Sequence, residues 1–184
     1  AAATENELIA LLDRVESHLD GDFRSYVLPP EWDERKERLM ARGINPPRYR
    51  HQRGPVTFAT SLCGAENLIY LILENPDCAA RFRDIILRTM IAFGRLMDAE
   101  NGDTPETAPR GFHFFDDNCC LLTPEMYEFW AYPILKGVFD EFAPDPVDWR
   151  YQHSDSDMEH LLPILARLDF SQVNFGPTLS VASI

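Results

Sequence analysis

Long apolar runs and positive charge are both scarce in this sequence. The longest uninterrupted run of aliphatic and aromatic residues is LIYLIL at 68–73, well short of the roughly 20 residues that span a bilayer. The chain has 17 Lys and Arg residues against 30 Asp and Glu residues, a formal net charge of −13. Such an acidic chain lacks the basic surface that nucleic acids and anionic lipids require. We therefore expect no nucleic-acid partner and no membrane partner.

Cysteine is also sparse. The sequence holds Cys63, Cys78, Cys119 and Cys120, and no two of them form a CxxC pair. Adjacent cysteines on a strand point to opposite faces, so Cys119 and Cys120 do not bridge easily. The N-terminal residues show no basic start followed by an apolar stretch, so we expect no secretory signal. We expect reduced thiols and a cytoplasmic protein.

The rest of the composition is that of a soluble globular protein with a real core, because 45% of the 184 residues are hydrophobic. The first 53 residues predict a helical N-terminal region. Its expected parts are an amphipathic helix at 6–19, a charged helix at 31–43 and a proline-broken connector at 44–54. The connector carries Arg48, Arg50 and Arg53. We expect these arginines to lie in a solvated connector, although they could instead contact carboxylates or a phosphate of a ligand.

From residue 54 onward the pattern predicts strands that alternate with helices. Asn75 and Pro76 suit the N-cap and the first turn of one of these helices. Alternation of this kind indicates parallel β-α units. The start of a further helix is expected at 180–184. The expected strands are 55–60, 111–117, 147–152 and 171–176, and the expected helices are 64–74, 77–99, 123–142 and 158–168.

Polar side chains follow each predicted strand. In parallel α/β folds, ligands bind at the carboxyl ends of the strands, so these side chains are candidate site residues. The alternative is that strand ends meet solvent and are polar for that reason alone. The clusters are Thr60 and Ser61; Asp116, Asp117 and Asn118; His153 and Asp155; and Asn174.

Three segments resemble the uroporphyrinogen decarboxylase superfamily, in the order and with the spacing of that family. They are GPVTFATSLCGAENLIYLILENP, FFDDNCCLLTPEMYEFWAYPILKGVFDEF and QHSDSDMEHLLPILARLDFSQVNFGP. The resemblance covers roughly residues 54–180 and implies a (β/α)8 TIM barrel. Such a barrel typically needs about 250 residues, so we expect 54–184 to form only part of one.

The resemblance implies one of two chemistries. In the superfamily's corrinoid-linked methyltransferases, a strand ends in His-x-Cys and these residues bind zinc. Here the matching stretch is His153-Ser154-Asp155, which implies a metal on His153 and Asp155 in a harder, more oxygen-rich site. We favour this methyltransferase-like branch, with a small molecule or a corrinoid protein as substrate and zinc as the candidate metal. Whether the chain forms a homo-oligomer stays open.

Two alternatives remain. One is a metal-free decarboxylase of a tetrapyrrole or another carboxylated substrate, although the arginine-rich signature of that branch is missing. The other is a barrel without chemistry that acts as a binding or assembly module, because Asp155 stands where a thiolate is expected.

Individual residues receive the following roles. His153 and Asp117 are candidate catalytic groups, since a carboxylate at a strand end can bind N–H groups or act as a general base. On a strand, Asp116 and Asp117 would point to opposite sides, and we prefer Asp117 as the one that faces the barrel mouth. Asp116, Asn118 and Asn174 are candidate substrate-binding residues.

Ser156 with Glu159 fits a capping box, which would leave Asp155 free to face a ligand, while an N-cap role for Asp155 is the alternative.

Overall fold

Four short strands form a parallel sheet in the part of the chain that the computed structural model describes, residues 2, 4–180 and 182. The strands lie in the order of the sequence, and each pairs in parallel with the next. This confirms a mixed α/β fold with a parallel sheet. The strands are β1 (His51–Arg53), β2 (Phe112–Phe115), β3 (Arg150–Ser154) and β4 (Gln172–Phe175).

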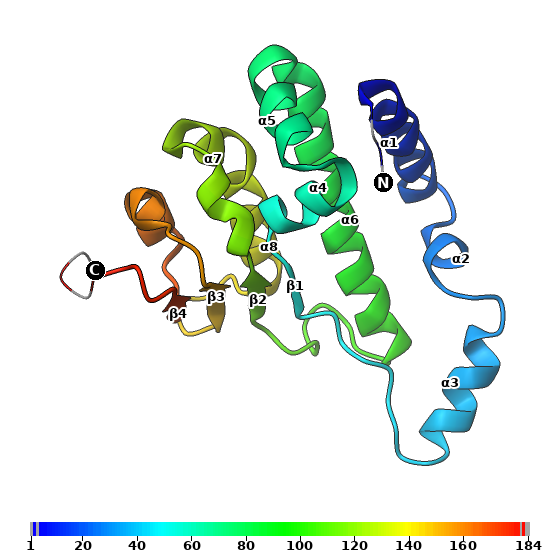
Figure 1. Cartoon of the computed structure of the whole chain (residues 1–184). Coiled ribbons are helices and arrows are strands. Elements are labelled where there is room, and N and C mark those ends of the chain that lie inside the picture. The colour runs from blue at the N-terminus through cyan, green and yellow to red at the C-terminus, as the bar shows by residue number, and fades with distance from the viewer. Residues whose placement is uncertain (1, 3, 181, 183–184) are drawn as a thin grey trace.

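Helices pack on one face and at one end of this sheet. In Figure 1, α1 (Glu5–Leu19) runs beside the long helix α6 (Pro76–Glu100), and α8 (Tyr132–Phe142) lies behind β2. No single helix among the described residues is both long and apolar enough to cross a membrane; only α4 and α5 together, bent by 102°, pass that test. The helices are α1 (Glu5–Leu19), α2 (Phe23–Val27), α3 (Trp32–Met40), α4 (Pro55–Cys63), α5 (Ala65–Glu74), α6 (Pro76–Glu100), α7 (Pro124–Trp130), α8 (Tyr132–Phe142) and α9 (Leu162–Leu165), with 3₁₀ helices η1 (Asp117–Leu121), η2 (Glu159–Leu161) and η3 (Ala166–Leu168).

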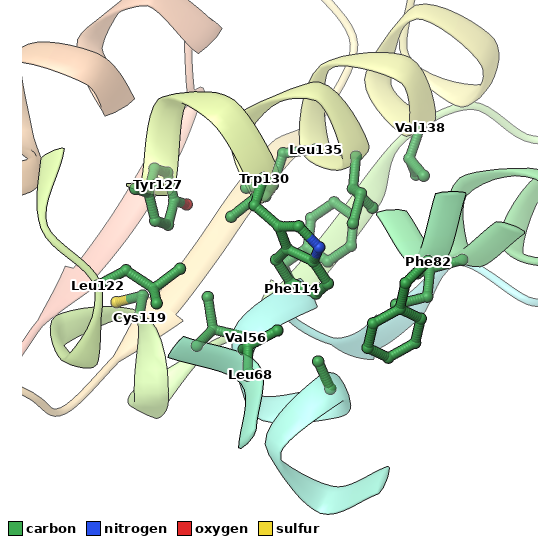
Figure 2. Close-up of a cluster of buried hydrophobic side chains, with 14 of the residues drawn as sticks. Val56, Leu68, Phe82, Phe114, Cys119, Leu122, Tyr127, Trp130, Leu135 and Val138 are labelled. Atoms are coloured by element: carbon green, nitrogen blue, oxygen red, sulfur yellow. The ribbon is translucent and has the colours of Figure 1, made fainter. Parts of the chain in front are cut away.

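The hydrophobic core lies between the sheet and these helices (Figure 2). Phe114 of β2 and Trp130 of α7 are both 0% exposed, and Phe82 of α6 packs against the Trp130 ring. The Trp130 indole donates to the backbone oxygen of Ala79 at 3.0 Å, so its polar atom is satisfied inside the core. Full burial of side chains of this size contributes about 1.5–3 kcal/mol each.

The two faces of the sheet differ sharply. Phe112, Phe114 and Gln152 point into the core. The opposite side, here called the open face, has side chains that are exposed or half-buried. Parallel sheets are normally covered on both faces, so a face of this kind is where a ligand or further structure is expected. The open face consists of His51, Arg53, His113, Phe115, Tyr151, His153, Gln172 and Asn174.

The strand expected at 55–60 is wrong, since these residues form helix α4. Val56, Thr57 and Thr60 favour a strand locally. The extended Gly54 precedes Pro55 in the first turn, and no side chain at the N-cap itself closes the helix. The carboxylate of Asp116 serves instead, accepting the Thr57 N–H at 2.8 Å and, more weakly, the Val56 N–H at 3.4 Å. A distant cap therefore overrides local preference, and β1 lies just upstream, in the predicted connector.

Other predicted elements are present with different bounds. Asn75 caps α6 and accepts the Cys78 N–H at 3.2 Å, as expected. The single helix expected at 123–142 is two helices, because the chain turns at Ala131 and Pro133 opens the second one. The helix expected at 158–168 is a series of short turns that ends at Asp169, which has a positive φ of 49°. The helix start expected at 180–184 includes residues 181, 183 and 184, which lie outside the described part.

A buried carboxylate joins the N-terminal helices to α6. Glu100, the last residue of α6, accepts hydrogen bonds from Arg24 at 2.7 Å, Trp32 at 2.7 Å and Lys36 at 2.6 Å. Burial alone would raise the pKa of Glu100, but these donors outweigh it and lower the pKa to about 2. Glu100 therefore holds α2 and α3 against the end of α6 as an ionised group.

We expect Glu100→Gln to lower the free energy of unfolding at pH 7 by about 1–3 kcal/mol, because it removes a charged acceptor from three donors. Since the pKa of Glu100 is lower in the folded chain than its ordinary value, the contribution is complete above about pH 4.5 and is lost as the pH falls toward 2. Urea unfolding of both proteins across this range measures it. Glu34→Gln, on the exposed face of α3, is the control and is expected to change little. A difference that does not shrink at low pH would contradict the assignment.

Candidate functional site

Three titratable side chains meet at the carboxyl edge of the sheet. His153 lies on β3, Asp155 follows that strand directly, and Asp117 begins η1 just after β2. His153 Nε2 lies 3.5 Å from Asp155 Oδ2 and 4.0 Å from Asp117 Oδ1. One ligand atom from each residue lies within 4.8 Å of the others. We call these three residues the edge cluster.

The backbone around the edge cluster explains why the side chains converge. His153 and Asp155 are two residues apart on nearly extended chain, which puts their side chains on one side. Asp117 Oδ1 accepts the backbone N–H of Asp155 at 2.9 Å, so the turns after β2 and β3 are joined. Gly176 packs so closely on Asp155 that a Cβ there would lie 2.3 Å from the Asp155 carbonyl oxygen. The end of β4 can approach this turn only because residue 176 has no side chain.

The separation of His153 and Asp155, 3.5 Å, suits two ligands of one metal ion better than a direct hydrogen bond. Nitrogen–oxygen hydrogen bonds span about 2.7–3.2 Å, which is shorter than both His153 separations. Two ligands that each lie about 2.1 Å from a tetrahedral zinc are about 3.4 Å apart. The set offers one imidazole nitrogen and two carboxylate oxygens, a mixture that zinc and other divalent transition metals accept. The side chains of His153, Asp117 and Asp155 are 28%, 56% and 69% exposed, so a ligand can reach them.

Asp116 lies apart from the edge cluster, although it is adjacent to Asp117 in sequence. It is 0% exposed, and its carboxylate accepts backbone N–H groups at the start of α4. Burial raises the pKa of Asp116 to about 6, while the bonds from Thr57 and Val56 oppose that rise. Gly54 makes room for it, since a Cβ on Gly54 would lie 2.1 Å from the Asp116 Cβ. The structure thus places Asp116 as a support of the site, out of reach of a substrate.

The two candidate asparagines occupy different positions. Asn118 is half-buried and tied to α4: its backbone N–H donates to Thr57 Oγ1 at 3.0 Å and its amide donates to Thr60 Oγ1 at 2.7 Å. Asn174 is exposed on β4, in register with His153. Asn174 therefore lies on the open face beside the edge cluster, whereas Asn118 mainly holds η1 against α4.

The capping box expected for Ser156 and Glu159 is wrong. Met158 occupies the N-cap position of η2, and no side chain caps it. Ser156 Oγ instead lies 2.7 Å from Ser154 Oγ, and both hydroxyls approach the sulfur of Cys119. Burial raises the pKa of the Cys119 thiol to about 12, so Cys119 is a packed thiol and no nucleophile at neutral pH. The Asp155 side chain is 69% exposed, although the Ser156 cap that was expected to free it does not form.

Two residues near the edge cluster were not among the predicted site residues. Phe115 is in register with His153, and their ring centroids lie 6.0 Å apart on the open face. Arg53 is in register with Phe115 and extends the same row by one strand. A β1 strand of three residues has too little sequence for its alternation to be recognised, so Arg53 could not be assigned to a face from the sequence.

A comparison of the chain with models of protein families, with curated proteins and with solved structures finds no significant match.

We expect Asp116→Asn to change how stability depends on pH, because the amide oxygen still accepts the Thr57 N–H but cannot ionise. Since the pKa of Asp116 is raised on folding from 3.8 to about 6, ionisation destabilises the folded wild type as the pH rises between these values. The variant lacks that loss, so its stability relative to wild type should rise by the order of 2 kcal/mol from pH 4 to pH 7. Chemical unfolding at several pH values measures it, with Asp157→Asn as control. A constant difference would refute the assignment.

Proposed function

We propose that this chain belongs to a methyltransferase-like enzyme of the uroporphyrinogen decarboxylase superfamily, which transfers a methyl group to or from a corrinoid with the help of a divalent metal. The edge cluster carries the proposal, because His153 and Asp155 stand where the superfamily's methyltransferases have His-x-Cys. Asp117 adds a third ligand from the neighbouring strand. The three segments of resemblance and the order of the parallel strands support a partial (β/α) barrel, with the open face on its inner side.

His153, Asp155 and Asp117 would hold the metal. Three protein ligands leave a coordination position for a substrate atom, as in catalytic rather than structural zinc sites. The ion would supply Lewis acid chemistry that stabilises the anion of a methyl-accepting group such as a thiol. Asp117 is oriented by the Asp155 N–H, and the Phe115 ring lies beside the His153 ring, with their centroids 6.0 Å apart. With Asp155 in place of a thiolate and Asp117 as a second carboxylate, the site favours zinc or manganese over softer metals.

The same proposal places the protein in the cytoplasm and gives it a small molecule or a corrinoid protein as substrate. All four cysteines are free thiols, three buried and one half-buried, which suits a reducing compartment. The excess of acidic side chains gives no surface for nucleic acid or anionic lipid.

We expect the purified untagged chain, stripped with chelator, to bind one zinc or manganese ion per molecule in a calorimetric titration. Asp155→Asn and His153→Ala should each weaken binding by at least about 10-fold, because each removes one of three protein ligands. Asp157→Asn makes the same charge change two residues away, outside the edge cluster, and should bind as wild type does. Equal binding by all four proteins, or none by wild type, would reject the metal site.

The two alternatives from the sequence predict other outcomes. A metal-free decarboxylase would convert uroporphyrinogen to coproporphyrinogen in the presence of chelator, and we expect no such product. A binding module without chemistry would gain tight zinc binding on Asp155→Cys while wild type shows none. Methyl transfer from a methylated corrinoid to a thiol, lost in His153→Ala and kept in Asp157→Asn, would support the proposed enzyme over both.

A further inference from the structure

Most of the Lys and Arg side chains of this chain pair with its own carboxylates, and Arg53 is one of the exceptions. Arg48 pairs with Asp103 at 2.7 Å and Arg50 with Asp98 at 2.7 Å. Arg53 has no carboxylate partner among the described residues, although the net charge is −13. Its side chain donates from Nη1 to the Ser61 hydroxyl at 3.1 Å. An exposed guanidinium thus remains open to an anion from outside the chain.

Arg53 lies in the same row of the open face as the edge cluster. Arg53 pairs in register with Phe115, Phe115 with His153, and His153 with Asn174. Register partners in a parallel sheet project to the same side, and neighbouring strands lie about 4.8 Å apart. The backbones of Arg53 and His153 are therefore about 10 Å apart, with the 39% exposed Phe115 between them. A cation, an aromatic ring and a metal-ligand set follow one another along a line.

The base of Arg53 is held firmly. Gly54, the next residue, packs against the buried Asp116, and Ser61, which contacts the guanidinium, in turn donates to the Thr57 carbonyl at 2.8 Å. A guanidinium has five N–H donors, and one of them serves Ser61. The remaining donors can bind both oxygens of a carboxylate or phosphate, which lysine's compact ammonium does less well.

We propose that Arg53 binds an anionic group of the substrate, a carboxylate or a phosphate, while the reacting end of the same molecule lies at the edge cluster and its middle packs on Phe115. This inference rests on the proposed function for the reacting end only. It defines the substrate class as an elongated molecule with an apolar or aromatic centre and an anionic group roughly 6–10 Å from the reacting atom.

A pair of matched thiols tests the inference on the zinc-loaded chain. In 4-sulfanylbenzoate, the thiol can reach the metal, the ring can pack on Phe115 and the carboxylate can reach Arg53. In 4-sulfanylbenzamide, a neutral amide replaces the carboxylate. We expect wild type to bind the benzoate about fivefold more tightly, the upper end for an exposed ion pair. Arg53→Gln should abolish this preference and Arg53→Lys should keep part of it. Arg42→Gln, which removes an unpaired arginine near α3, should keep all of it.

The outcomes separate this inference from the metal site, because zinc binding is titrated first in each protein. Equal zinc binding in wild type and Arg53→Gln, with the preference lost only in the variant, supports Arg53 as the anion site. Equal zinc binding with the same preference in both, or with none in wild type, overturns it and leaves the metal site intact.

If wild type binds no zinc, the proposed function fails, and anion binding by Arg53 is then tested on the metal-free protein. Benzoate and phenyl phosphate are then titrated in chelator. Weaker binding of either by Arg53→Gln, with Arg42→Gln unchanged, keeps the anion site and shows which anion it prefers. Equal affinities of both anions for wild type and Arg53→Gln overturn it.

Discussion

The buried carboxylate of Asp116 accepts the first backbone N–H groups of α4, and the carboxyl edge of the sheet is built around this contact. It holds the turn after β1 against the end of β2. Val56 and Thr57 precede Asp116 by 60 and 59 residues in the sequence. Asp116 is turned inward, whereas the next side chain, Asp117, is 56% exposed. A buried carboxylate with a raised pKa is costly, and its cost is offset by ordering both strand ends at once.

The same alternation divides the whole sheet into two surfaces. Phe112 and Phe114 fill the core beneath α8, while His113 and Phe115 on the same strand face outward. Rings continue across the open face, where His113 contacts both Trp149 and Tyr151. An outward surface this rich in aromatic and imidazole rings is poorly suited to bare solvent, and it is well suited to a flat or elongated ligand.

Most positively charged side chains of this protein are paired with carboxylates. Carboxylates outnumber cations, and most cations are held by neighbouring carboxylates, as Glu100 holds Arg24 and Lys36 at the base of α6. The carboxyl edge of the sheet differs in two ways. Asp117 and Asp155 lie beside the His153 imidazole with no Lys or Arg partner among the described residues, and Arg53 lacks a carboxylate. A divalent metal beside Asp117 and Asp155, together with an anionic ligand on Arg53, would balance these charges.

From its sequence alone, the chain could be assigned a parallel α/β fold, the cap of α6, and His153, Asp155 and Asp117 as candidates at strand ends. Periodicity, capping residues and the two-residue alternation of strands are local properties, so they can be recognised without coordinates. The helical state of 55–63, the inward role of Asp116, the partners of Ser156 and the row from Arg53 to His153 depend on contacts between distant segments. Only the tertiary structure decided these, because a cap supplied from another strand and the register between strands leave no trace in local sequence.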